Sequence, residues 1–333
     1  MRNAVRLIVG IGVSAGCFYL ATRGTDWSGV RAVLAGAHPF WAVVLIVASV
    51  FTVYVRARRW CILLRPAGQV SVYDAFASTA IGFGANTVLP FRLGEIVRPV
   101  LLGRKARIGM MAAFSSVVLE RIFDMGLIIG CFLIVSLVYP DLPAGLRVSA
   151  LGLAAGALLG LVVMFVVQRN RALVEHVLGV LPTGIERRLR PMVESFLNGL
   201  GAIDQPSSFL TVVAYSIYLW GAIVTTFLFG FLALDVPIPH LAGSLATMVI
   251  VAVFVALPQA PGFVGTWQAG CVLALGLFGV PQETAVGFSL FTWVVQMVVN
   301  LGTAGFFMAR EDLSFAQVVR SATSEAPTVR AEG

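Results

Sequence analysis

The chain has 333 residues, of which 59% are hydrophobic and only 12% are charged. Soluble domains carry about 25% charged residues, so this composition indicates a polytopic membrane protein and excludes a separate soluble catalytic domain. The net charge is +7. In a membrane protein, an excess of basic residues first indicates which loops face the cytoplasm and where anionic lipid headgroups are contacted. We therefore expect no binding to nucleic acid.

Long apolar runs mark the segments that we expect to cross the membrane. A spanning helix needs about 20 apolar residues to cross about 30 Å of hydrocarbon. The candidate full spans are 5–22, 39–55, 109–139, 147–167, 208–234 and 284–308. The sequence therefore predicts an all-α membrane protein with about six full transmembrane helices. Arg2 and Arg6 precede the first run, which we interpret as an uncleaved first helix rather than a signal peptide.

Two further apolar segments are interrupted by proline and glycine. One covers 74–102 and breaks near Pro90, and the other covers 240–280 and breaks near Pro258. The arm before the first break is about 24 Å long at 1.5 Å per residue, which is too short to cross the bilayer. We therefore expect a re-entrant hairpin at 74–102. Segment 240–280 is either a second hairpin from the opposite face, which allows an inverted repeat, or a short pair of spans.

Basic residues indicate which loops face the cytoplasm, because cytoplasmic loops carry an excess of Lys and Arg. Such residues follow the second span, the first broken segment and the last span, and five more arginines lie between 168 and 191. We therefore expect a multi-pass protein of the cytoplasmic (inner) membrane with both termini in the cytoplasm.

The chain is expected to consist of one membrane domain and a short tail. Residues 1–313 form the transmembrane domain, and residues 314–333 form a cytoplasmic tail that is disordered toward its end from about Ser321. Within the domain, segment 171–201 alternates apolar residues with Arg and Glu. This pattern is typical of amphipathic helices on the cytoplasmic surface, and a solvated connector is the alternative.

The most informative polar residues surround the first break. Arg92, Glu95 and Arg98 are three residues apart and share one face of a helix that begins near Phe91, and Asn86 precedes the break. Charges at membrane depth are costly and usually face a cavity or a substrate. Arginine is a planar, always-charged phosphate ligand, so the pattern favours binding of a lipid phosphate. The alternative is a simple ion pair between Glu95 and Arg98 at the interface.

A second charged group lies inside the apolar run 109–139. Glu120 and Asp124 are four residues apart and face one way, and Arg121 can pair with Asp124. One charge at the bilayer centre costs about 2.5–3.5 kcal/mol on insertion scales. We therefore expect these three side chains to face the same cavity as the hairpin charges. The alternative is a structural ion pair that locks helices together.

Two more groups of residues are candidates for contact with a ligand. The second broken segment contains prolines and glycines that free backbone groups, and its candidate residues are Pro258, Gln259, Pro261, Gly262, Gly265 and Gln268. A kinked helix–helix contact is the alternative there. The second span ends in a basic cluster that includes Arg56, Arg58, Arg59 and Trp60. This cluster is a topology anchor or a contact for lipid phosphates.

The four cysteines and three histidines show no ligand spacing, so we expect no metal site and no cofactor. In their order along the chain, the polar groups resemble a flippase-like family, the transmembrane region of lysylphosphatidylglycerol synthases. The residues that carry the resemblance are Arg59-Trp60, the run from Asn86 to Arg98, Glu120-Arg121 with Asp124, and Pro261-Gly262 with Gly265.

The resemblance implies movement of a lipid across the cytoplasmic membrane, such as an aminoacylated phospholipid in members with two domains. The late motif of the family usually reads Pro-Gly-Gly-Leu-Gly with a glutamate three residues on. This chain has Phe263-Val264 between Gly262 and Gly265, and Gln268 in place of the glutamate. The chain also lacks the soluble aminoacyl-transferase domain, so we do not expect it to make lysylphosphatidylglycerol.

These features predict a non-enzymatic, flippase-like transporter that moves or binds a polar-headed or anionic lipid. Phospholipids, aminoacyl-phospholipids and polyprenyl-linked lipids all fit that description. One alternative is a membrane-embedded glycosyltransferase or lipid-modifying enzyme that uses Glu95, Glu120 or Asp124 as acid and base. The other is a non-transporting partner subunit of a lipid or glycan synthase.

Overall fold

The computed structural model describes residues 2–138, 170–184 and 206–324, with scattered positions between 155 and 197. Within these ranges every regular element is a helix, which confirms the all-α prediction. The elements are α1 (Arg2–Thr22), α2 (Trp27–Ala35), α3 (Pro39–Leu63), α4 (Val72–Val88), η1 (Pro90–Arg92), α5 (Gly94–Ala106), α6 (Met110–Val138), α8 (Arg171–Gly179), α10 (Pro206–Ala233), α11 (His240–Ala256), η3 (Pro261–Phe263), α12 (Thr266–Gly276), α13 (Gln282–Arg310) and α14 (Phe315–Ser324).

Among the described residues, three helices are long and apolar enough to cross a membrane. They are Pro39–Leu63, Ser207–Ala233 and Gln282–Arg310. They match three of the predicted spans, and the protein is therefore a multi-pass membrane protein. The predicted first span forms the shorter apolar helix Ile8–Thr22, and the third forms α6, which is long but carries three charges. The predicted span 147–167 falls almost entirely outside the described residues.

Both predicted breaks are present, and proline causes each of them. Leu89 precedes Pro90 and has an extended backbone with ψ 143°, and Leu257 precedes Pro258 with ψ 154°. The ring of a proline disfavours helical geometry in the residue before it, so α4 and α11 end there. The chain then turns back as α5 and α12, which pack against α4 and α11 respectively. We call the pair α4–α5 the first hairpin and the pair α11–α12 the second hairpin because of this packing; whether either is re-entrant in the membrane stays a prediction. The helix expected near Phe91 begins later, at Gly94.

Small residues allow the two arms of the first hairpin to pack closely. A side chain at Gly94 would bring its Cβ to 1.9 Å from the carbonyl oxygen of Gly82. On the far side of α4, a Cβ at Gly84 would lie 2.3 Å from the Cβ of Ala304 in α13. Close backbone approach through small residues is how helices associate where lipid removes the hydrophobic driving force.

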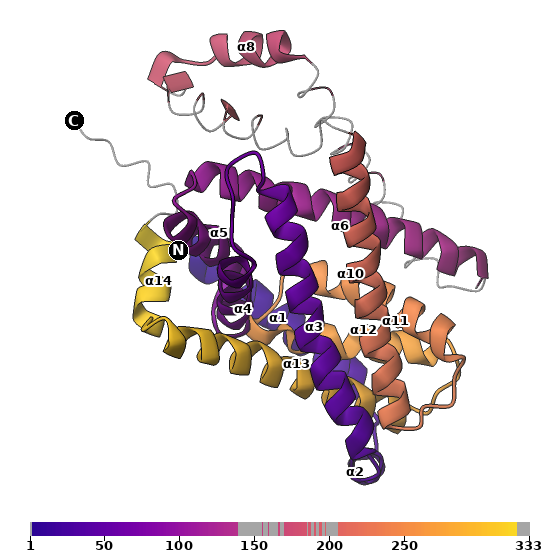
Figure 1. The fold of residues 1–333 in the computed structure, drawn as a ribbon. Helices are drawn as coiled ribbons and strands as arrows, with labels where there is room; N and C mark the ends of the chain where they lie inside the picture. Colours follow the sequence, from indigo (N-terminus) through magenta and orange to yellow (C-terminus); the bar gives the residue numbers. More distant parts are fainter. Residues whose placement is uncertain are drawn as a thin grey trace.

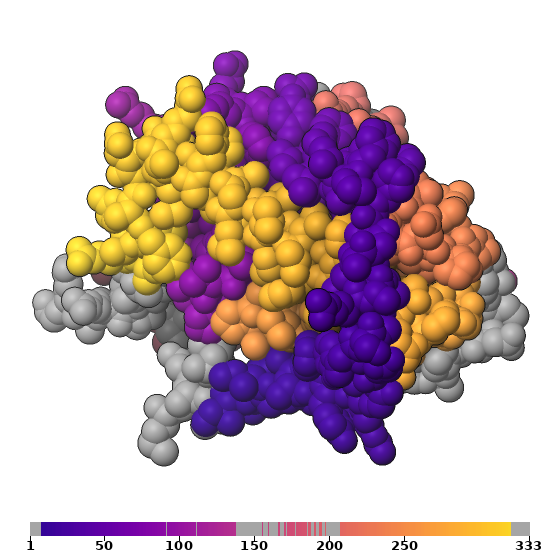
Figure 2. All heavy atoms as spheres, turned by 90° about the horizontal axis from the view of Figure 1, so that it is seen from below, coloured from indigo at the N-terminus to yellow at the C-terminus, as the bar shows by residue number. Residues whose placement is uncertain are grey.

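Several other helices pack against one or both hairpins, namely α1, α3, α6, α10, α13 and α14. In Figure 1, α3 and α10 run side by side, and both contact α6. Figure 2 shows the face on which the indigo N-terminal helices lie against the orange and yellow C-terminal ones, and α1 contacts α12 there. A Cβ at Gly265 would lie 1.9 Å from the carbonyl oxygen of Ser14. The first helix therefore fits directly on the tip of the second hairpin.

The polar segments are only partly described. Segment 171–201 begins with α8, and Arg190 pairs with Glu175 and Glu186 at 2.7 and 2.8 Å. The predicted tail contains α14, which packs against α5. Residues 321–324, predicted to belong to the disordered end, lie in this helix, and residues 325–333 lie outside the described part of the chain.

Candidate functional site

A buried ion cluster joins three helices around two carboxylates of α6. We define the ion cluster as Arg56 and Arg59 of α3, Arg98 of α5, and Glu120 and Asp124 of α6. An Nη atom of Arg56 lies 2.8 Å from Glu120 and 3.2 Å from Asp124. Arg59 donates a hydrogen bond to Asp124 at 2.7 Å. Arg98 donates two hydrogen bonds to the carboxylate of Glu120, at 3.0 and 2.9 Å.

Neutral side chains complete the ion cluster. The indole of Trp220 donates to Asp124 at 3.0 Å, and Arg59 donates to the hydroxyl of Ser216 at 2.9 Å. Both partners come from α10, so a fourth helix is tied to the cluster. The guanidinium of Arg98 lies 3.8 Å from the ring centroid of Trp60, which is a cation–π contact.

The ion cluster is almost fully enclosed. Glu120 and Arg59 are 0% exposed, and Arg98 is 1% exposed. Taking such charges out of water costs several kcal/mol per ion, and only good pairing geometry offsets it. For Glu120 and Asp124 this is the helix-locking arrangement that was the alternative, and it leaves these two carboxylates little access to a ligand.

A cavity with both charged and apolar lining residues lies beside the ion cluster. This inner cavity has a volume of about 270 Å³ and is lined by residues from α3 to α6 and from α10 to α13. Its charged lining consists of Arg56, Arg92, Glu95 and Arg121. Its neutral polar lining consists of Asn86, Trp220, Thr226, Trp267, Gln296 and Asn300. Among its described residues, the wall thus carries three arginines and one carboxylate, and one of these arginines, Arg56, is also paired with Glu120 and Asp124 of the ion cluster.

Glu95 and Arg121 form an ion pair on the cavity wall. One Nη atom of Arg121 lies 3.1 Å from both carboxylate oxygens of Glu95. The two side chains are 29% and 40% exposed, in contrast to the enclosed ion cluster. Arg121 also approaches Asp124 at 3.8 Å, as its spacing on α6 predicted. This pair is therefore the part of the charge network that a ligand in the cavity can reach.

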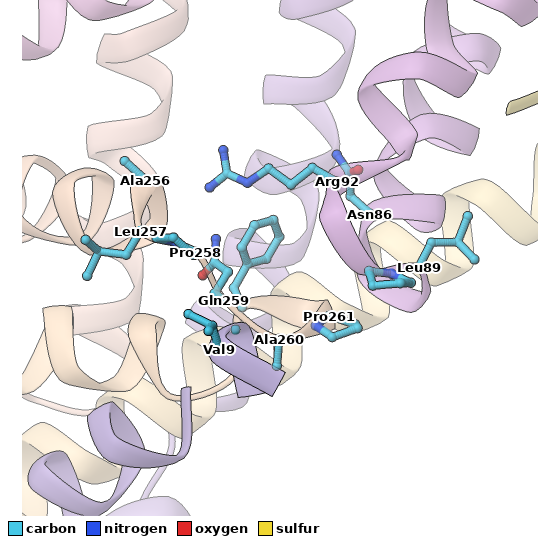
Figure 3. Close-up of a pocket in the computed structure, with 13 residues that line it drawn as sticks. Val9, Asn86, Leu89, Arg92, Ala256, Leu257, Pro258, Gln259, Ala260 and Pro261 are labelled. Carbon is cyan, nitrogen blue, oxygen red and sulfur yellow. The ribbon is translucent and has the colours of Figure 1, made fainter. Parts of the chain in front are cut away.

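A second cavity lies on the other side of Arg92. This outer groove has a volume of about 510 Å³ and is lined by residues of α1 and of both hairpin tips. In Figure 3, Arg92 extends from the first hairpin toward the chain around Leu257. Its guanidinium donates to the carbonyl oxygen of Val255 and lies 5.7 Å from the ring centroid of Phe263.

The predicted residues of the first hairpin divide between the two environments. Asn86, Arg92 and Glu95 line the inner cavity, whereas Arg98 belongs to the ion cluster. The predicted common face does not include Arg92, because Arg92 lies in η1 with φ 52° and α5 begins only at Gly94. Glu95 pairs with Arg121 and not with Arg98.

The predicted residues of the second hairpin also have distinct places. Pro258, Gln259 and Pro261 line the outer groove. Gly262 and Gly265 adopt φ 71° and 83°, which a side chain disfavours. The side-chain oxygen of Gln268 accepts from the backbone N–H of Gly265 at 2.7 Å, so Gln268 caps the start of α12 from a buried position.

Several lining residues were missed by the sequence analysis. Gln296 and Asn300 lie in α13 and are hydrogen-bonded to each other at 2.9 Å. Two amides four residues apart in an otherwise apolar span share one face, and this spacing was the available signal. Ser216 and Trp220 show the same spacing in α10. Hydroxyl and indole groups are common at membrane depth, so that second signal is weak.

Comparison with protein families gives a match over most of the chain. Residues 7–302 match the family described as the lysylphosphatidylglycerol synthase TM region. The chain belongs to this family. No curated protein and no solved structure matched the chain. Membership confirms the resemblance that the polar motifs indicated and associates the chain with membrane lipids.

The family match and the site agree in their location. The matched range includes both hairpins, the ion cluster and every residue that lines the inner cavity. The member described here has an uncharged Gln268 at the start of α12, where it caps the helix. The charge of the inner cavity is therefore supplied by the first hairpin together with α3 and α6.

Proposed function

We propose that the protein binds a lipid with an anionic headgroup in the inner cavity and moves it across the cytoplasmic membrane. The observation that carries this proposal is an excess of positive charge: among the described residues of the ion cluster and the cavity wall, five arginines meet three carboxylates, namely Arg56, Arg59, Arg92, Arg98 and Arg121 against Glu95, Glu120 and Asp124. Guanidinium groups in a site of low dielectric bind phosphate strongly and with defined geometry.

The positive charge that we expect to bind the headgroup belongs to the arginine of the cavity wall that lacks a carboxylate partner within the described part of the chain. Arg56 already forms ion pairs with Glu120 and Asp124, and Arg121 forms one with Glu95. Among the residues that the structure describes, no carboxylate forms an ion pair with Arg92. A phosphate in the inner cavity would supply the missing negative charge for Arg92 and compete with Glu95 for Arg121.

Movement of the lipid requires the two hairpin tips to separate. The tips meet where Arg92 of the first hairpin bonds to Val255 and approaches Phe263 of the second. A phosphate that takes the guanidinium of Arg92 from the carbonyl oxygen of Val255 would remove this contact. Ligand binding would then favour a state in which the tips are apart, which is the coupling that alternating access needs.

The test compares lipids retained by the purified protein in native mass spectrometry with lipidomics. Arg92→Gln and Arg121→Gln are the informative variants, because both residues line the inner cavity. Arg98→Gln is not suitable, because Arg98 is enclosed in the ion cluster and its loss would disturb folding. We expect each cavity variant to lose most of the retained anionic lipid and to slow lipid exchange between leaflets of proteoliposomes.

The matched control is Arg58→Gln, the same change at an exposed position of α3 outside the inner cavity. It should retain lipid as the wild type does. Retention of the wild-type lipid by both cavity variants would contradict the proposal.

An enzymatic role has less support than binding and transport. Acid–base chemistry on a lipid needs carboxylates that reach the substrate. Among the described residues, Glu95 is the one carboxylate on the wall of the inner cavity, while Glu120 and Asp124 are engaged by arginines. Absence of headgroup turnover by the purified protein is the expected result. A role as partner of a synthase predicts co-purification with that enzyme and no lipid movement by the protein alone.

A further inference from the structure

Residues from three separate segments of the chain line the outer groove. Val9 and Gly10 of α1 form one wall, Leu89 and Pro90 form the second, and residues 256–261 form the third. Figure 3 shows these side chains around one space. Most of them are hydrocarbon, so the groove suits an apolar occupant.

Fixed hydrogen bonds hold the walls in place. The backbone N–H of Ala260 donates to the hydroxyl of Ser14 in α1 at 2.8 Å. The indole of Trp293 donates to the carbonyl oxygen of Gly262 at 2.7 Å. The backbone of the second hairpin tip is therefore tied to α1 on one side and to α13 on the other.

The outer groove and the inner cavity share one set of residues, which we call the neck. Asn86, Arg92 and Phe263 line both spaces. Arg92 and Phe263 have φ of 52° and 61°, a backbone conformation that is unfavourable for bulky residues and clusters at functional sites. The side-chain oxygen of Asn86, which is 7% exposed, has no hydrogen-bond partner among the described residues.

The two spaces differ in charge. The inner cavity combines three arginines, one carboxylate and several amides with apolar side chains, whereas Arg92 is the one charged residue among the described residues that line the outer groove. A membrane lipid has the same order of parts: a polar headgroup, a phosphate and hydrocarbon chains. We propose that the outer groove binds the hydrocarbon chains of the lipid whose headgroup lies in the inner cavity, with its phosphate at the neck. This inference rests on the proposed function and extends it.

The groove does not need to contribute hydrophobic energy to do this. A lipid chain is as well solvated by the bilayer as by leucine, so moving it into an apolar groove gains little free energy. What the groove supplies is room for the chain beside the charged cavity. Filling the groove should therefore exclude lipids with long chains by steric overlap and leave a headgroup without chains unaffected.

The experiment fills the groove from two sides. Ala256→Trp and Val9→Trp place a large ring at exposed positions that line the groove on different helices, so neither should disturb folding. Ile11→Trp is the matched control, because Ile11 is also exposed on α1 but does not line the groove. The probes are dioleoylphosphatidylglycerol, measured by retention in native mass spectrometry, and chain-free glycerophosphoglycerol, measured by calorimetric titration.

We expect both groove variants to retain the two-chain lipid at least about tenfold less than the Ile11→Trp control, through steric exclusion. Their Kd for the chain-free probe should equal that of the wild type. Wild-type retention of the two-chain lipid in both groove variants would overturn the inference. Equal weakening of both probes would also overturn it, because the groove would then act only through the headgroup site.

The cavity variant Arg121→Gln separates this result from failure of the proposed function. If it loses the two-chain lipid while the groove variants keep it, the groove inference alone is wrong. If the wild type does not bind the chain-free probe, or if Arg121→Gln binds both probes as the wild type does, the headgroup site itself is wrong and the inference falls with it.

Discussion

The ion cluster and the wall of the inner cavity use the same two residue types for different purposes. Glu120 in the cluster is 0% exposed and is held by two bonds from Arg98. Glu95 on the wall is 29% exposed and is held by a single nitrogen of Arg121. The comparison teaches that a charge at membrane depth is not by itself a sign of function. Enclosure and pairing decide whether it stabilises the fold or meets a ligand.

The largest expected effect is loss of folding on Glu120→Gln. The change leaves Arg56, Arg59 and Arg98 with Asp124 as the one carboxylate of the ion cluster. Breaking a buried pair in this way costs about 3–5 kcal/mol, because it leaves charge uncompensated. We expect a strongly lowered melting midpoint and little monodisperse protein in fluorescence-detected size exclusion.

Glu95→Gln is the matched control, the same chemical change at a partly exposed position. It should melt as the wild type does. Equal destabilisation by the two variants would remove the distinction between cluster and wall.

A smaller loss is expected for Gln268→Ala, which removes a buried polar partner without changing charge. Gln268 is 1% exposed, and its side chain accepts from the backbone N–H of Gly265. An unsatisfied buried donor costs about 1–3 kcal/mol. The melting midpoint of Gln268→Ala should fall, but less than that of Glu120→Gln. A second variant, Gln268→Glu, should keep the cap while adding an unpaired charge. A midpoint unchanged in Gln268→Ala would show that the cap is dispensable.

The ends of the helices in both hairpins were predictable from the sequence because a proline terminates a helix in each of them. Leu89-Pro90 and Leu257-Pro258 set the ends of α4 and α11 through a local rule that holds in any fold. The division of the charges was not predictable in this way. Arg98 and Glu95 are three residues apart on one helix, yet one is enclosed by Trp60 and Glu120 and the other lines the inner cavity.

That division depends on contacts between distant segments. Spacing on α5 places Glu95 and Arg98 near one face, but only the packing of α6 against α5 and the ring of Trp60 at Arg98 determine which of them is covered. The contribution of α10 through Ser216 and Trp220 is also a matter of tertiary packing. The strained backbone of Arg92 follows from the turn after Pro90, which a helical-face argument does not include.

Glu95→Gln should also change binding. Removal of the carboxylate frees Arg121 from Glu95 and leaves the described residues of the cavity wall with three arginines and no carboxylate of their own, while Glu120 and Asp124 remain in the ion cluster. Affinity for an anionic headgroup should therefore increase by about tenfold, which is about 1.4 kcal/mol. Titration with nanodiscs that contain phosphatidylglycerol, compared with phosphatidylcholine alone, measures this gain. A weaker affinity would show that Glu95 holds Arg121 in its binding position.

The smallest effect is expected at an ion pair in contact with water. Arg190 pairs with Glu175 and Glu186 at distances as short as those in the ion cluster. Exposed pairs contribute little, because solvent screens the charges and ordering the side chains costs entropy. Arg190→Gln should therefore leave the melting midpoint unchanged within error, and added salt should have no larger effect on the wild type than on the variant. Destabilisation by Arg190→Gln as large as that by Glu120→Gln would show that short distance, rather than enclosure, determines how much an ion pair stabilises the fold. The distinction between the ion cluster and the cavity wall would then lose its physical basis.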